Sequence, residues 1–215
     1  MYKVNEFWWS PEPPEGFFSQ RLEPKIDIWY QQRYRYWIYQ NIPQRRTMID
    51  VGANIGIFAR PSAEIFEQVV CFEPVSTNFA VLEKNLADCS NVVLHQTGLS
   101  NHAHRAVFEM QKDKCGHSRQ IDTWGNDAAF EYHECDLVTL DSFNYHQVDW
   151  IKIDVEGYEM AVLEGATDTI KSNRPWLLIE RNGQEQYHEQ WLNDLCGPYE
   201  AAPVKSKTNT IWVPK

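Results

Sequence analysis

The sequence lacks any long run of apolar residues. A membrane-spanning helix needs about 18 or more consecutive apolar residues, and no such stretch occurs. The chain also does not open with a basic region followed by an apolar one, so a secretory signal is not expected. The 215 residues, with 43% hydrophobic and 23% charged content, suit a water-soluble globular protein.

Positive charge is scarce as well. Twenty Lys and Arg residues stand against 30 Asp and Glu residues, which gives a formal net charge of −10. A protein that binds nucleic acid needs a basic surface for the phosphates, so we expect no nucleic-acid partner. The imbalance is uneven, because residues 1–46 carry +2 and the rest of the chain carries −12.

The cysteines show no spacing typical of a metal site or a disulfide framework. They are five in number and form no C-x-x-C pair. Reduced thiols of this kind favour a cytoplasmic protein. The five residues are Cys71, Cys89, Cys115, Cys135 and Cys196.

Aromatic residues are concentrated at the start of the chain, where residues 1–46 hold 12 of the 29. Tyr30, Tyr34, Trp37 and Ile38 have helical spacing, which predicts one amphipathic helix over residues 28–41. We therefore separate an aromatic-rich N-terminal extension, 1–46, from a main domain, 47–215. The favoured hypothesis is that the extension packs on a sheet or on a second subunit in a homo-oligomer. The alternative is that Trp8 and Trp9 cover a bound substrate as a lid.

From residue 47 onward the pattern alternates between strands and helices. This alternation predicts an α/β fold with a mainly parallel sheet that is covered by helices on both faces. The expected strands are 47–51, 68–72, 92–95, 106–110, 150–153, 176–179 and 210–213; the expected helices are 77–87 and 157–170, and 113–127 is expected to be a loop.

A glycine-rich turn follows the first of these strands, at Asp50 to Gly56. Small residues there would let the backbone approach a ligand closely. Glu73 comes 21 residues after Gly52, at the end of the next strand, where a carboxylate can accept hydrogen bonds from ribose hydroxyls. A nicotinamide dinucleotide is disfavoured, because G-x-G-x-x-G would need glycine where Asn54 and Ile57 stand.

A second signature is Asp154-Val155-Glu156-Gly157, which follows the buried strand 150–153. The strand delivers Asp154 to the same edge of the sheet as Asp50 and Glu73. Glu156 lies at the start of the next helix, where an acidic residue is also stabilising by itself.

These segments resemble the FkbM-type methyltransferase family. The resemblance covers roughly residues 47–181 and rests on segments that stand in family order: Ile49 to Gly56, Phe72-Glu73-Pro74, Thr139 to Phe143, Ile151 to Gly157, Val162 to Ala166 and Arg174 to Glu180.

The resemblance implies a Rossmann-like class I methyltransferase fold with one antiparallel strand, at 210–213. It implies S-adenosylmethionine as cofactor and methylation of a hydroxyl on a sugar or another small natural product. By the same resemblance, Asp50, Gly52, Asn54 and Gly56 hold the methionine end, Glu73 holds the ribose and Asp154 faces the transferred methyl group. The alternative is a non-catalytic subunit that binds the cofactor or serves as a structural partner.

The acceptor hydroxyl must lose a proton, and two routes are open. A side chain can act as base, for which Asp154, Glu156 and the loop residue His117 are the candidates. Alternatively, Asp154 and Glu156 can bind a divalent metal that lowers the pKa of the hydroxyl. The metal-free route is slightly favoured. Pro61 departs from the family pattern, so the helix after the glycine turn either starts near Pro61 or is kinked.

Overall fold

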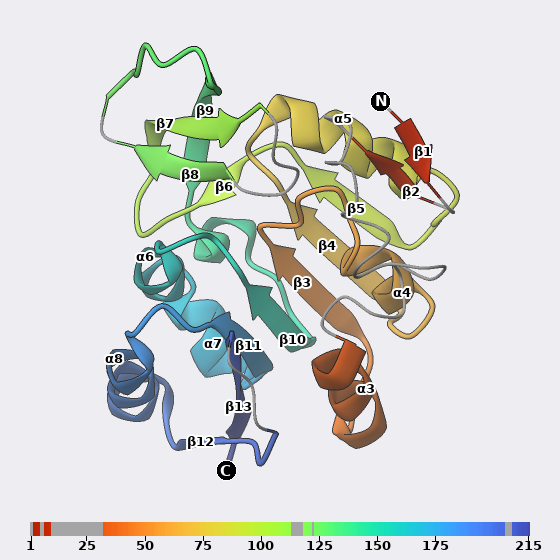
Figure 1. The fold of residues 1–215 in the computed structure, drawn as a ribbon. Coiled ribbons are helices and arrows are strands. Elements are labelled where there is room, and N and C mark those ends of the chain that lie inside the picture. The colour runs from red at the N-terminus through yellow and green to blue at the C-terminus, as the bar shows by residue number, and fades with distance from the viewer. Residues whose placement is uncertain (1, 5–6, 10–31, 113–117, 122, 205–207) are drawn as a thin grey trace.

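The computed structural model describes residues 2–4, 7–9, 32–112, 118–121, 123–204 and 208–215. Its centre is a seven-stranded sheet in the order β12-β13-β11-β10-β3-β4-β5 (Figure 1). β13 runs antiparallel to both of its neighbours, whereas the five strands from β11 to β5 are parallel. The predicted mainly parallel sheet with one antiparallel strand is confirmed. The strands are β3 (Thr47–Val51), β4 (Gln68–Phe72), β5 (Val92–His95), β10 (Val148–Ile153), β11 (Trp176–Glu180), β12 (Tyr199–Ala201) and β13 (Asn209–Pro214).

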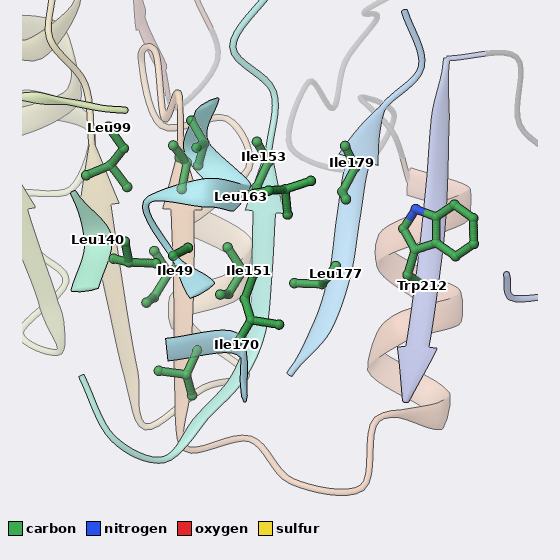
Figure 2. Close-up of a cluster of buried hydrophobic side chains, with 14 of the residues drawn as sticks. Ile49, Leu99, Leu140, Ile151, Ile153, Leu163, Ile170, Leu177, Ile179 and Trp212 are labelled. Atoms are coloured by element: carbon green, nitrogen blue, oxygen red, sulfur yellow. The ribbon is translucent and has the colours of Figure 1, made fainter. Parts of the chain in front are cut away.

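Helices cover both faces of this sheet. The central strands β3 and β10 are therefore buried along their whole length. One face packs against α6 (Glu159–Glu164), α7 (Thr167–Asn173) and the π-helical turn η2 (Leu192–Cys196), which follows α8 (Glu185–Trp191). Figure 2 shows Leu163 and Ile170 from these helices against Ile49, Ile151 and Leu177 of the strands. The opposite face packs against α3 (Gln32–Asn41), α4 (Ala59–Ala63) and α5 (Ser76–Asn85).

Trp150 is the centre of this second core and is fully buried. Its ring lies 5.2 Å from Phe58 and 5.7 Å from Phe66, measured between centroids. Helix α3 joins the same cluster through Ile38, and Trp37 stacks on Trp176 at 5.3 Å. The described part of the amphipathic helix therefore packs on the sheet. Tyr30 and the side chains of Trp8 and Trp9, on which the lid hypothesis depends, lie outside the described residues.

A smaller sheet is inserted between β5 and β10 and has the order β6-β9-β7-β8. Its strands are β6 (Gly98–Leu99), β7 (His104–Gln111), β8 (Ser118–Ile121) and β9 (Phe130–Val138). The expectation of a loop over 113–127 was wrong for Ser118–Ile121, because these residues pair with β7 in an antiparallel ladder. A further hairpin of β1 (Tyr2–Val4) and β2 (Phe7–Trp9) is drawn beside α5 (Figure 1).

The expected helix over 157–170 is two short helices, α6 and α7. The chain turns at Gly165, whose backbone passes so close to Ser100 that an added Cβ would lie 2.0 Å from the Ser100 carbonyl oxygen. The helix after the glycine turn starts close to Pro61, because α4 begins at Ala59. Pro61 thus lies in the first helical turn, where its missing N–H costs little. The Ile57 carbonyl, four residues earlier, accepts a hydrogen bond from Arg35 Nη1 at 3.4 Å.

Candidate functional site

The glycine turn between β3 and α4 is held tightly between two neighbouring strands. Gly52, Asn54 and Gly56 have φ angles of 75°, 51° and 88°, which lie in the left-handed region. The backbone N–H of Gly52 donates to the Phe72 carbonyl at 3.0 Å. On the other side, a Cβ at Gly52 would lie 2.0 Å from the Asp154 carbonyl oxygen. Only glycine therefore fits where the turn passes the end of β10.

Asp50 lies beneath this turn and is fully buried. Its Oδ1 accepts a hydrogen bond from Lys152 Nζ at 2.9 Å, and the same ammonium donates to the Gly52 carbonyl at 2.9 Å. Burial raises the pKa of Asp50, and the positive charge of Lys152 opposes that shift. The predicted role of Asp50 in cofactor binding stays a prediction, and the carboxylate is placed to support the turn from below.

Glu73 follows β4 and is also buried. Its Oε2 accepts from the Asn54 backbone N–H at 2.9 Å, and its Oε1 accepts from the Val75 N–H at 3.0 Å and from Asn78 Nδ2 at 3.4 Å. Burial raises the pKa of Glu73 to about 7, against the effect of these hydrogen bonds. The carboxyl group ties the glycine turn to the loop after β4, which is where a ribose was expected.

Three carboxyl groups meet at the ends of β10 and β11. Asp154, Glu156 and Glu180 each place an oxygen within 4.8 Å of the others. The side chain of Asp154 is 16% exposed, and its Oδ2 lies 4.0 Å from Lys152 Nζ. Carboxylate oxygens are the ligands that magnesium and calcium prefer, so these three residues could hold a divalent ion.

Sequence reasoning missed Glu180 as a site residue. Its pKa is raised to about 8, first by burial and then by the negative charges of Asp154, Glu156 and Glu159, and a hydrogen bond with Asp154 acts in the same direction. The available signal was its position, because Glu180 ends the strand that pairs in parallel with β10. Carboxyl ends of parallel strands meet at one edge of the sheet.

The backbone between Asp154 and α6 adopts left-handed conformations. Glu156 has a φ of 53° and Gly157 has a φ of 105°, which are two successive left-handed residues. The buried carboxylate of Glu159 accepts from the N–H groups of Val155, at 3.3 Å, and Gly157, at 3.1 Å. Its other oxygen accepts from Asn182 Nδ2, so the turn is anchored to the loop after β11.

A mainly apolar pocket adjoins the glycine turn. Its walls come from the ends of β3 and β4, from the inserted sheet and from the turn that carries Asp154. The lining residues are Val51, Gly52, Phe72, Pro74, Gly98, Leu99, Phe108, Gln120, Leu137, Val155 and Tyr158. Gln120 and Tyr158 are the polar side chains of this lining.

Most of the residues singled out from the sequence come together at this edge of the sheet. Gly52 meets Asp154, Asn54 meets Glu73, and Asp154 lies beside Glu156. Gly56 instead faces α5, because a Cβ there would lie 2.9 Å from Leu82 Cδ1. His117 lies outside the described residues.

Solved structures with a similar fold are methyltransferases and related enzymes. A methyltransferase FkbM from Methylobacillus flagellatus KT has a TM-score of 0.58 at 18% identity; the alignment covers 91% of this chain and 49% of that one, so this chain spans about half its length. A ribosomal protein L11 methylase from Lactobacillus delbrueckii subsp. bulgaricus gives 0.52 at 13% identity, with 86% and 78% covered. A precorrin 8W decarboxylase from Methanobacterium thermoautotrophicum gives 0.55 at 13% identity, with 100% of both chains covered. These likenesses establish the class I methyltransferase fold.

Three further findings concern the kind of protein this is. Among the described residues, every helix is too short or too polar to span a bilayer. No curated protein sequence matches the chain. The family model of the methyltransferase FkbM domain, however, matches residues 50–201, which is more than half of the chain and includes every described site residue above. The chain therefore belongs to the FkbM methyltransferase family.

Proposed function

We propose that this protein uses S-adenosylmethionine to methylate a hydroxyl group of a sugar or another small natural product. The observation that carries the proposal is the meeting of the glycine turn, the apolar pocket and Asp154 at one edge of the parallel sheet. Ligands of open α/β folds bind at this edge. Family membership supports a methyltransferase, and the choice of a hydroxyl acceptor is our proposal.

The residues around the pocket fit this cofactor. We assign the apolar walls to the adenine ring and Glu73, which follows β4, to the ribose hydroxyls. Asp50, Gly52, Asn54 and Gly56 form the turn proposed to hold the methionine end. The buried Oδ2 of Asp50 has no hydrogen-bond partner among the described residues, so the turn retains an acceptor.

Bound S-adenosylmethionine would supply an electrophilic methyl group on a positively charged sulfur. The task of the protein is to orient the acceptor oxygen and to receive its proton. We assign proton acceptance to Asp154, which is partly exposed and directly follows β10, next to the glycine turn. Glu156 and Glu180 adjoin Asp154 and set the charge around it. His117 is the second candidate base.

We propose a metal-free reaction, and removal of metal ions tests this choice. Enzyme treated with EDTA and then freed of it should keep its methyl-transfer rate. Strict dependence on added magnesium or calcium would overturn the metal-free route and make Asp154, Glu156 and Glu180 the candidate ligands. Replacement of Glu156 by Gln is the matched variant, because it would weaken metal activation while leaving Asp154 in place.

The acceptor class is tested by incubating the protein with S-adenosylmethionine that carries an isotopically labelled methyl group. Acceptor pools should include sugars and glycans, polyketides, lipids, protein and RNA. Label in a base-stable methyl ether of a sugar or natural product is the expected result. Label found only on nitrogen or carbon, or only in protein or RNA, would overturn the proposal. Cofactor binding without transfer to any pool would favour the non-catalytic alternative.

A further inference from the structure

Lys152 is a buried lysine in the middle of the parallel sheet. It lies on β10, is 3% exposed and pairs in register with Asp50 on β3. A charged lysine in such a position is costly unless it is paired. The groups that surround the Lys152 ammonium therefore indicate the role of this side chain.

The ammonium group of Lys152 joins three parts of the candidate site. It donates to Asp50 Oδ1 at 2.9 Å and to the Gly52 carbonyl at 2.9 Å, and it lies 4.0 Å from Asp154 Oδ2. One side chain thus contacts the end of β3, the glycine turn and the carboxylate at the end of β10. It also lies 5.7 Å from the centroid of the Phe58 ring, behind the turn.

The glycine turn is fixed on one side by β4 and on the other side by Lys152 of β10. The N–H groups of Gly52 and Ala53 both donate to the Phe72 carbonyl on β4, at 3.0 Å. The Gly52 carbonyl points the other way and is held by Lys152 on β10. Loss of the lysine would release the peptide group on the side that faces Asp154.

We infer that Lys152 is a positioning residue that fixes the glycine turn relative to Asp154 and so prepares the cofactor site. The inference rests on the proposed function and names a residue outside its proposed binding and proton-accepting groups. The side chain acts through Gly52, Asp50 and Asp154, since it is buried beneath them.

The test compares Lys152→Met with Asp50→Asn, with the double variant Asp50→Asn/Lys152→Met and with Ile170→Ala, a core variant in α7. The probe is S-adenosylhomocysteine, with its affinity measured by titration calorimetry. Lys152→Met should weaken binding about tenfold, the size expected when a hydrogen bond to a charged group is lost. Ile170→Ala should lose thermal stability but bind like wild type.

The double variant separates positioning from simple charge pairing, because it removes both members of the buried ion pair. It should regain thermal stability relative to Lys152→Met but bind the probe more weakly than the single variant Asp50→Asn, in which Lys152 still holds the Gly52 carbonyl. Amide hydrogen exchange in the peptide over residues 50–58 should be faster than in wild type. If Lys152→Met does not fold, the comparison of the double variant with Asp50→Asn tests the inference.

Affinity and exchange in the double variant equal to those of Asp50→Asn would overturn the inference and leave the proposed function standing. Absence of probe binding by the wild-type protein would overturn the proposed function, and the inference with it.

Discussion

Asp154 lies close to both a buried cation, Lys152, and a second carboxyl group, Glu180. Replacement by Asn keeps the size of the side chain and removes its ability to take a proton. We expect Asp154→Asn to lose about 100-fold or more in methyl-transfer rate, the usual contribution of a positioned base. Affinity for S-adenosylhomocysteine should stay within about twofold, because a base adds little to ground-state binding. The exposed Asp194→Asn is the control, and wild-type turnover in Asp154→Asn would remove Asp154 from the mechanism.

Glu180 should make the folded state less stable as the pH rises. Its pKa is raised from 4.5 to about 8, so the folded protein keeps a proton that the unfolded chain releases near pH 4.5. The stability contribution is therefore full below pH 4.5 and is lost as the pH rises toward 8. Glu180→Gln should show a shallower decline of unfolding free energy over this range, measured by denaturant titration at several pH values. Exposed Glu189→Gln is the control. A slope equal to that of wild type in Glu180→Gln would contradict this prediction.

The site could be predicted from the sequence where a residue type and a strand end coincide. Asp154 and Glu73 follow apolar runs, and the turn after Asp50 is marked by its glycines. Glu180 directly follows the expected strand 176–179, but its proximity to Asp154 depends on which strands are neighbours in the sheet. Lys152 had a weaker signal, a single charge inside an apolar strand. Its partners follow only from the register of β3 and β10.

At the scale of elements, the break between α6 and α7 is set by a close backbone contact. Gly165 has an ordinary φ of −79°, so alanine there is unfavourable only because its Cβ would meet the Ser100 carbonyl. We expect Gly165→Ala to lower the unfolding free energy by about 1–3 kcal/mol, the cost of overpacking.

Gly183 is the matched control for this substitution. It has a φ of 84° with open space around its Cβ position, so Gly183→Ala tests backbone strain without a clash, at about 1–2 kcal/mol. Urea titration of both variants measures the two effects. A Gly165→Ala protein as stable as wild type would mean that the loop carrying Ser100 yields to the new side chain.

The central strands could be predicted because they are apolar runs bounded by glycine, proline or acidic residues. Of the inserted sheet only β7 was expected, as a strand over 106–110. β9 was not, since it reads Phe-Glu-Tyr-His-Glu-Cys-Asp-Leu-Val and is only partly buried along most of its length. β8 and β9 are formed by pairing with β7 rather than by burial of an apolar face. Helix α8 was missed for a similar reason, because it buries little besides His188.

At the scale of the whole molecule, the described pocket is built from residues 51–158 and α3 is anchored by Ile38. A protein that lacks residues 1–22 should therefore keep wild-type affinity for S-adenosylhomocysteine. If the N-terminal extension serves packing or self-association, as we propose, the acceptor KM should also be unchanged, and the mass from light scattering reports any loss of a homo-oligomer. A raised acceptor KM with unchanged cofactor affinity would instead support a lid formed by Trp8 and Trp9.

The buried thiol of Cys71 can report how often the central sheet opens. Cys71 lies on β4 with no exposed surface, and burial raises the pKa of its thiol far above the ordinary value. Cys89, by contrast, is only partly buried. A maleimide added to the native protein would modify Cys89 early and Cys71 only during rare openings of the sheet. The ratio of the two labelling rates would then report how often the centre of the molecule opens, without any denaturant.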